Sequence, residues 1–307
     1  MQEMKQTVQE ERFTVSKGRD IGRDEEPAVS VESCFGRDEE PAVLIEKPAI
    51  KAAFFDIDGT LFSHRTQCVP ESTLCALKYL REKGILCAIA TGRHISEMKE
   101  MNFLNYGFDA YLTLNGQLCL DSNLETLFGS PMEGDNLRAM VDIFESREVP
   151  AILLSKDRMY INFVNNAVHS AHREIHTSIP EVGKYAGEPI YMGVIYCTKE
   201  AERPFAEKLQ GCNITRWSRH GLDIIPGNGD KVEGIRKYIE LNNITKDEII
   251  AFGDGENDIG MLSYAGIGVA LGNAEDEVKA AADYVTADID EDGVWKALEH
   301  LQIIVPE

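Results

Sequence analysis

Short hydrophobic runs alternate with stretches of helical periodicity along most of this chain. The run Ala52–Phe55 has the pattern of a buried strand, and Leu74, Leu77 and Leu80 then recur on one face of a helix expected at about 70–83. The same alternation predicts strands at 85–90, 110–114, 249–252 and 267–270, and helices near 95–104, 231–241 and 258–264. Strands that alternate with helices form a parallel sheet covered on both faces. We therefore expect a Rossmann-like α/β fold that binds its ligands beyond the carboxyl ends of its strands.

The region 131–211 interrupts this alternation. Its pattern predicts a helix at 135–146, strands at 151–154, 159–163 and 190–197, and a helix at 200–209. We interpret the region as a smaller inserted α+β domain with its own sheet. The main domain would then consist of 49–130 and 212–307, with strands at 213–217 and 222–225 leading back towards the main sheet.

The first 48 residues differ from the rest of the chain. They contain the octet Gly-Arg-Asp-Glu-Glu-Pro-Ala-Val twice, at 22–29 and 36–43. Two copies are fewer than a stacked repeat needs. The segment 1–48 is charged, poor in aromatic residues and interrupted by Pro27 and Pro41, so we expect a disordered or loosely attached extension. A regulatory or docking role is the alternative.

Composition narrows the class of protein. The 307 residues are 43% hydrophobic, enough for a full-sized core, and their formal net charge is −21. Such acidity argues against nucleic acid or a membrane as a partner, but not against a small anion bound at a local site. There is no apolar run of membrane-spanning length, no signal-peptide pattern and no CxxC pair among seven cysteines. We expect a cytoplasmic protein, and the oligomeric state stays open.

Asp56 and Asp58 follow the strand Ala52–Phe55 directly, and Gly59 marks the turn that ends it. Residues i and i+2 of an extended segment point to the same side, so the two carboxylates should lie close together. Neighbouring carboxylates repel each other, and a dication such as Mg2+ is the usual remedy. One carboxylate could attack phosphorus while the other transfers a proton. The alternative is an ordinary turn that contains two aspartates.

Two further sites suit a phosphate group. Thr91 and Gly92 end a strand, where a hydroxyl and backbone N–H groups can form a phosphate cradle, although Thr-Gly is common at such turns. Arg93 follows them and could equally be a surface arginine. Lys231 begins a helix, a position where the helix dipole disfavours a cation. That misfit is explained if Lys231 faces a phosphate and a nucleophile; the alternative is a solvated lysine.

Two more turns carry amides or carboxylates. The segment Gly253-Asp254-Gly255-Glu256-Asn257-Asp258 follows a predicted strand, and hard oxygen ligands of this kind suit Mg2+. Asp258 could instead serve only as a helix cap. Asn115 follows the strand expected at 110–114 and could contact the substrate or form a plain turn.

The segment Asp56-Ile57-Asp58-Gly59-Thr60-Leu61 resembles the first motif of the haloacid dehalogenase superfamily. This resemblance implies that Asp56 is a nucleophile that forms an aspartyl-phosphate, and that Asp58 is the general acid and then the base. Thr91 and Gly92 stand where the second motif would provide phosphate ligands. Lys231 stands at the position of the third motif.

The segment 253–258 resembles the fourth motif of the same superfamily. It implies that Asp254 binds the metal, that Asp258 is a further carboxylate at the metal, and that Asn257 contacts the phosphate. Asp254 and Asp258, together with Asp56 and Asp58, make up the expected Mg2+ site.

The spacing of the motifs indicates a subclass. Thr91 follows Asp58 by only 33 residues (91 − 58), too few for a lid domain, whereas Lys231 follows Thr91 by 140 (231 − 91). The insert at 131–211 therefore resembles the type-B cap of Cof-like phosphatases, and the resemblance spans about 51–304. It implies a Mg2+-dependent phosphatase for small phosphorylated metabolites, with hexose phosphates as the first choice.

Two other functions are compatible with the same motifs. A phosphomutase would return the phosphoryl group to a sugar behind a cap that excludes water. A non-catalytic sensor of phosphorylated metabolites should lack at least one of the chemical residues, yet Asp56, Asp58, Lys231 and Asp254 are all present. Five residues of the insert and its exit could line the specificity surface or serve the core of the insert: Tyr160, Asn162, Arg216, Trp217 and His220.

Overall fold

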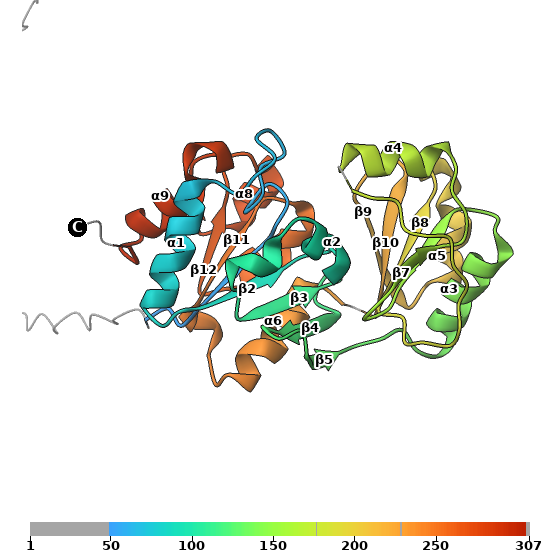
Figure 1. The fold of residues 1–307 in the computed structure, drawn as a ribbon, viewed down its shortest axis with the longest axis horizontal. Helices are drawn as coiled ribbons and strands as arrows, with labels where there is room; N and C mark the ends of the chain where they lie inside the picture. The colour runs from blue at the N-terminus through green and yellow to red at the C-terminus, as the bar shows by residue number, and fades with distance from the viewer. Residues whose placement is uncertain (1–48, 176, 228, 305–307) are drawn as a thin grey trace, which may run out of the picture. The chain divides into compact units, whose positions relative to one another are not determined.

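The main domain is built on an eight-stranded sheet. The computed structural model describes residues 49–175, 177–227 and 229–304; the extension expected at 1–48 lies outside them. In spatial order the strands are β13 (Tyr284–Val285), β12 (Ile267–Ala270), β11 (Ile249–Gly253), β1 (Ala52–Phe55), β2 (Leu86–Ala90), β3 (Ala110–Thr113), β4 (Leu118–Asp121) and β5 (Thr126–Gly129) (Figure 1). Strands β13 to β3 are parallel, and β4 and β5 extend the sheet as an antiparallel hairpin that the sequence analysis did not assign. The predicted α/β fold is confirmed.

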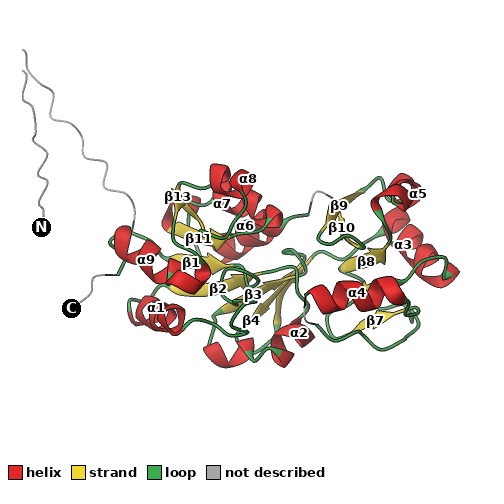
Figure 2. Cartoon of the chain, turned by 90° about the horizontal axis from the view of Figure 1, so that it is seen from above, coloured by secondary structure: helices red, strands yellow, loops and turns green. Residues whose placement is uncertain are grey.

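Helices cover both faces of this sheet (Figure 2). Helices α1 (Glu71–Glu82), α2 (Ile95–Glu100) and α9 (Gly293–His300) pack on one face, and α6 (Lys231–Leu241), α7 (Ile259–Tyr264) and α8 (Asp276–Ala281) pack on the other. Short 3-10 helices lie at Phe103–Tyr106, Lys199–Ala201, Lys246–Glu248, Glu256–Asp258 and Ile289–Glu291. Among the helices of the described residues, none has the length and apolarity needed to cross a membrane.

Strand β1 is the centre of the core. Ala53 and Phe55 face the α1 and α9 side, whereas Ala52 and Phe54 face the α6 side, and all four side chains are fully buried. Phe55 stacks on Phe252 of β11 with ring centroids 5.0 Å apart. A parallel strand buried on both faces needs apolar residues at every position, which is why β1 shows no alternation.

The insert has its own antiparallel sheet. The spatial order is β7 (Met159–Ile161), β6 (Ala151–Leu154), β8 (Met192–Tyr196), β10 (Gly221–Pro226) and β9 (Cys212–Arg216). Helices α3 (Gly134–Ser146) and α5 (Arg203–Lys208) pack on one face of this sheet. Helix α4 (Asn166–Glu174) packs on the other face through Val168 and Ala171.

The strand pairing corrects the expected boundary at residue 211. The strands expected at 213–217 and 222–225 do not lead back to the main sheet; they are β9 and β10, and β10 is hydrogen-bonded to both β8 and β9. On this pairing the insert ends at Pro226. Apolar alternation identifies a strand but not the sheet that it joins, because the pairing partners lie elsewhere in the chain.

Phe55→Ala should lower the free energy of unfolding by about 3–5 kcal/mol, because it leaves a cavity beside Phe252 in the centre of the sheet. Urea denaturation followed by circular dichroism measures this change. Leu127→Ala on β5 is the control, since that side chain is 43% exposed, and it should cost less than about 0.5 kcal/mol. Equal losses for the two variants would contradict the central position of β1 in the core.

Candidate active site

Four adjacent strands end at the same edge of the main sheet. The residues that follow β11, β1 and β2 directly are Asp254, Asp56 and Thr91, and Asn115 lies two residues beyond β3. The carboxyl ends of parallel strands meet at one edge, so motifs far apart in the sequence converge there.

Three carboxylates form a tight cluster at this edge. One oxygen from each of Asp56, Asp254 and Asp258 lies within 4.8 Å of the other two. Asp258 Oδ2 accepts hydrogen bonds from the backbone N–H groups of Asp254 (3.0 Å) and Gly255 (2.9 Å). Asp254 Oδ1 accepts a hydrogen bond from the Thr60 hydroxyl at 2.7 Å. These hydrogen bonds fix the direction of two of the three carboxylates.

The turn after β1 requires a glycine. Gly59 has a φ of +80°, and a Cβ atom built there would lie 2.1 Å from Asp254 Oδ2. Any side chain at this position would therefore push Asp254 out of the cluster.

Lys231 is the cation of this cluster. Asp230 caps α6 by accepting the N–H of Glu233 at 2.9 Å, which makes Lys231 the first helical residue. The Lys231 Nζ atom, almost fully buried, donates to Asp56 Oδ1 at 2.6 Å and to Asp258 Oδ1 at 2.7 Å. Burial acts to lower the pKa of Lys231, but Asp258 and Asp56 outweigh it and raise that pKa. The lysine is therefore charged, and it lies beside Asp56 as the sequence analysis expected.

The cluster keeps an excess of negative charge. Burial raises the pKa of Asp56 well above its ordinary value, Lys231 opposes this rise, and the charges of Asp258, Asp58 and Asp254 add to it. Burial likewise raises the pKa of Asp254 to about 7. Three carboxylates share one ammonium group, so a divalent cation would stabilise their ionised forms. Hard oxygen donors at this spacing fit Mg2+.

The Asp58 side chain points to a different set of partners. Its two oxygens accept hydrogen bonds from Arg93 Nε and Nη2, each at 2.6 Å, and His64 Nε2 lies 3.1 Å from Oδ1. Burial acts to raise the pKa of Asp58, but the hydrogen bonds from His64 and Arg93 lower it well below its usual range. Asp58 is not among the three clustered carboxylates, and the metal role expected for it stays a prediction. Arg93 is buried, so the alternative of a surface arginine is wrong.

The other expected phosphate ligands lie around the same edge. The Thr91 hydroxyl is buried and accepts the backbone N–H of Arg93 at 3.2 Å, and Gly92 lines the adjoining cavity. Asn257 also lines that cavity and donates to Asn115 Oδ1 at 3.2 Å.

Asn115 connects the main domain to the insert. It has a left-handed backbone (φ 53°), as does Leu114 before it (φ 55°). Asparagine tolerates this conformation better than most residues, whereas a buried leucine does so only when its surroundings hold it there. The Asn115 Nδ2 group donates to Asp223 Oδ2 on β10 at 3.1 Å. The expected substrate residue therefore contacts a carboxylate of the insert.

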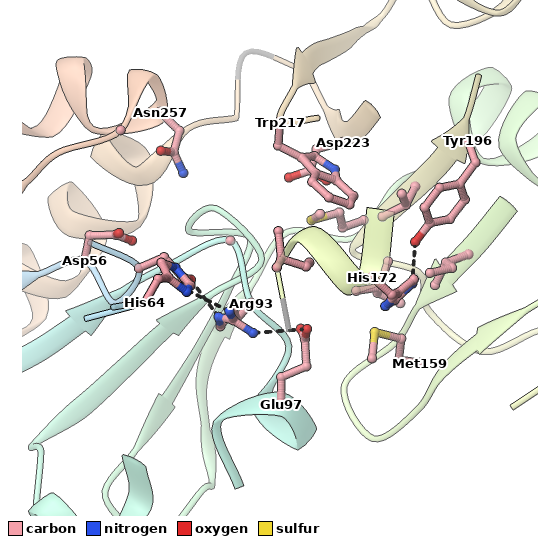
Figure 3. Close-up of a pocket in the computed structure, with 18 residues that line it drawn as sticks. Asp56, His64, Arg93, Glu97, Met159, His172, Tyr196, Trp217, Asp223 and Asn257 are labelled. Atoms are coloured by element: carbon pink, nitrogen blue, oxygen red, sulfur yellow. Dashed lines mark hydrogen bonds and ion pairs between the residues drawn. The ribbon is translucent and has the colours of Figure 1, made fainter. Parts of the chain in front are cut away.

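A cavity of about 300 Å3 lies between the residues of the main domain and those of the insert. Figure 3 shows Asp56, His64, Arg93 and Glu97 on one side, and Met159, His172, Tyr196, Trp217 and Asp223 across from them. The cavity is of the size that holds a small organic ligand.

Several lining residues were missed from the sequence: His64, Glu97, His172, Tyr196 and Asp223. The sequence contains only weak indications that these residues belong to a site. His64 lies in the loop that follows the first motif, and Asp223 is a lone carboxylate in the apolar run 222–225. Only their spatial neighbours show that they face a cavity.

Of the five candidates in or near the insert, only Trp217 lines the cavity. Asn162 hydrogen-bonds to backbone groups of the insert, including the N–H of Ala151 at 2.8 Å. Tyr160 packs edge-on against Phe144, and Arg216 forms an ion pair with Glu202 at 2.8 Å. These residues serve the insert's own structure.

Comparison with known proteins gives consistent matches. A family model described as haloacid dehalogenase-like hydrolase matches residues 53–298. YkrA of Bacillus subtilis (strain 168) is 32% identical over 257 residues, which cover 83% of this chain and 98% of that protein. YcsE of the same organism, a 5-amino-6-(5-phospho-D-ribitylamino)uracil phosphatase by name, is 28% identical and is matched over 82% of this chain and 95% of its own length. The solved structure of BT4131, described as a subclass IIB sugar phosphatase, is 36% identical with a TM-score of 0.74 and coverage of 83% of this chain and 100% of that chain.

Asp223 should make stability depend on pH. Burial raises its pKa from 3.8 to about 7, while the hydrogen bond from Asn115 opposes the rise. When the pKa of a carboxyl group is higher in the folded protein than in the unfolded chain, the free energy of unfolding is unaffected below the unfolded-state pKa. It then decreases as the pH rises through the folded-state pKa. Asp223→Asn should therefore raise Tm by a few degrees more at about pH 8 than at about pH 5.

Thermal unfolding in the presence of a chelator measures this difference. Asp142→Asn, at an exposed position of α3, is the control and should shift Tm equally at both pH values. The same pH-independent shift for Asp223→Asn would show that Asp223 keeps an ordinary pKa.

Proposed function

This chain belongs to the haloacid dehalogenase-like hydrolases and is a phosphatase, and from this premise we propose that it is a Mg2+-dependent phosphomonoesterase that acts through an aspartyl-phosphate. One observation supports this proposal most: Asp56 lies in a cluster of three carboxylates and is held 2.6 Å from a buried ammonium group. Such a cluster suits a carboxylate that must approach an anionic phosphate. The insert would then be the type-B cap that selects the organic part of the substrate.

In the first step, a carboxylate oxygen of Asp56 attacks phosphorus, and the bond from phosphorus to the ester oxygen breaks. Asp58 donates a proton to the departing alkoxide. In the second step, Asp58 accepts a proton from water, the water oxygen bonds to phosphorus, and the bond to Asp56 breaks to release inorganic phosphate. Lys231, with Thr91 and Gly92, would hold the phosphate oxygens throughout.

A bound Mg2+, held by Asp56, Asp254 and Asp258, would supply positive charge that offsets the charge of the phosphate. The chain's own contribution is positional: Lys231 orients Asp56, and the hydrogen bonds from Thr60 and the turn at 254–255 orient the other two carboxylates. Asn257 would contact the phosphate from the same turn.

Asp58 must lose its present partners before it can act as an acid. Arg93 and His64 favour its ionised form, which suits a base and opposes proton donation. A phosphate dianion is a competing bidentate partner for the Arg93 guanidinium. We therefore propose that Arg93 turns from Asp58 to the phosphate when substrate binds.

The substrate class proposed at this stage is a small phosphorylated metabolite. The hexose phosphates expected from the sequence are supported by the description of BT4131 as a sugar phosphatase, whereas the name of YcsE gives a substrate with a uracil ring. Relatives therefore support phosphomonoester chemistry more strongly than any one organic group. A cytoplasmic location, expected from the composition, is part of the same proposal.

Asp56→Asn should reduce Mg2+-dependent release of inorganic phosphate from phosphomonoesters to the background rate, because an amide is not a nucleophile towards phosphorus. A phosphate-release assay with and without Mg2+ measures this. Glu256→Gln, an exposed change in the 253–258 turn, is the control and should retain activity. Turnover by Asp56→Asn at the parental rate would exclude Asp56 as the nucleophile.

Asp58→Asn should slow turnover by about 10²–10⁴-fold, because it removes the proton shuttle while the nucleophile stays in place. Intact-mass spectrometry after reaction with an activated phosphoester should then detect protein carrying one phosphoryl group. The double variant with Asp56→Asn should carry none. Unphosphorylated Asp58→Asn protein that turns over normally would rule out the assigned acid–base role.

A further inference from the structure

The face of the insert sheet that points to the cavity is strongly apolar. Ile152 and Leu154 of β6 pair with Val194 and Met192 of β8, and all four side chains line the cavity. Met159 of β7 continues the same surface. Alternate residues of a strand share a face, so this surface is the one not covered by α3 and α5.

This wall offers few free polar groups to a ligand. Tyr196 and His172 line it, but the Tyr196 hydroxyl lies 2.8 Å from His172 Nε2, and His172 Nδ1 lies 2.9 Å from the Thr177 hydroxyl. Both side chains therefore use their polar atoms on each other and on Thr177. The Tyr196 hydroxyl can still form a further hydrogen bond, but a sugar that placed several hydroxyls against the wall would leave most of them without a partner.

Asp223 is the exception. On β10 it pairs with Val194 of β8, so its side chain lies on the same face of the sheet, beside Trp217 (Figure 3). Asn115 occupies one acceptor site of its carboxylate at 3.1 Å, and Trp217 contributes a second hydrogen bond. A carboxylate has about four acceptor sites, so it can accept a further donor from a ligand in the cavity.

The insert side of the cavity also lacks a cation among the described lining residues. Burial lowers the pKa of His172 to about 4, so the imidazole is neutral near pH 7. On the opposite side, the Arg93 cation and His64, whose pKa is raised by its hydrogen bond to Asp58, are both paired with Asp58. A ligand with a second phosphate or a carboxylate on its organic part would meet no cation there, only Asp223, the hydrogen-bonded pair Tyr196–His172 and apolar side chains.

We propose that the insert side of the cavity is a subsite for a compact, uncharged, apolar ring that carries one hydrogen-bond donor directed at Asp223. The substrate class would then be phosphomonoesters of ring-bearing alcohols rather than of polyhydroxylated sugars. This proposal rests on the proposed function, since Asp56 would act on the phosphate of the same molecule. A cavity of about 300 Å3 has room for one such ring with its phosphate.

Three phosphate esters of primary alcohols test the proposal, because their leaving groups have closely similar reactivity. They are benzyl phosphate, 3-(hydroxymethyl)benzyl phosphate and glucose 6-phosphate. We expect kcat/KM to be highest for the hydroxymethyl compound and at least about tenfold lower for glucose 6-phosphate, since the sugar leaves several hydroxyls without partners. A kcat/KM for glucose 6-phosphate that equals or exceeds those of both benzyl esters would overturn the proposal.

Two variants locate the specificity in the named residues. Asp223→Leu should reduce the advantage of the hydroxymethyl ester over benzyl phosphate to about twofold or less, mainly through KM. Met192→Gln, a substitution of similar size, should raise KM for benzyl phosphate severalfold without raising it for glucose 6-phosphate. Asp142→Leu, exposed on α3, is the matched control and should leave all three values unchanged. An unchanged preference in both Asp223→Leu and Met192→Gln would contradict the subsite.

A binding measurement separates failure of this subsite from failure of the proposed chemistry. Calorimetric titration of Asp56→Asn protein with Mg2+ present compares the affinities of the same esters without turnover. Tighter binding of the benzyl esters, with no phosphate release by the parent protein, would support the subsite and reject the phosphatase mechanism. Efficient release of phosphate from glucose 6-phosphate, with weak binding of both benzyl esters, would support the phosphatase mechanism and reject the subsite.

Discussion

The buried ammonium group of Lys231 is the interaction on which the rest of the site depends. It lies between Asp56 and Asp258, at 2.6 Å and 2.7 Å, in a place where three carboxylates converge. Removing one partner of such a group would leave an uncompensated buried charge, which is far more costly than losing a surface ion pair. The lysine offsets only part of the negative charge, and this deficit is the physical reason why the cluster suits a dication. The folded protein therefore holds a group of carboxylates whose negative charge is only partly neutralised, and a bound metal ion would neutralise the remainder.

The parallel sheet makes this arrangement rigid. β1 is buried on both faces, so the positions of Asp56 and Asp58 are set by a strand that cannot shift without opening the core. The turn that follows is equally constrained, since Gly59 packs where no Cβ atom fits beside Asp254. Chemistry at the edge of the sheet thus depends on packing within it. The insert contributes in a different way, because its apolar face and Asp223 line the opposite side of the cavity.

The charge pattern divides the cavity into two halves. One half is lined by charged or titratable side chains of the main domain, among them Asp56, Asp58, His64 and Arg93. The opposite half is mostly apolar: Tyr196 and His172 are hydrogen-bonded to each other, and Asp223 is joined to the main domain by Asn115. A phosphoester spanning the cavity would meet polar groups at one end and apolar ones at the other.

Short-range patterns in the amino-acid sequence predict the strands and most of the turns that carry the site. Uninterrupted apolar runs predicted the parallel strands of the main sheet. Asp56, Thr91 and Asp254 directly follow three of these strands and were expected at one edge, because parallel strands end together. Contacts between side chains depend on how the elements pack, and no local pattern predicts them. Arg93 binds Asp58, 35 positions away in the sequence, and Asn115 binds Asp223, 108 positions away. The periodicity of neighbouring residues gives no information about such separations. The apolar patterns of β9 and β10 likewise predict strands but not the sheet that they join. Their hydrogen-bonding partners place them in the sheet of the insert.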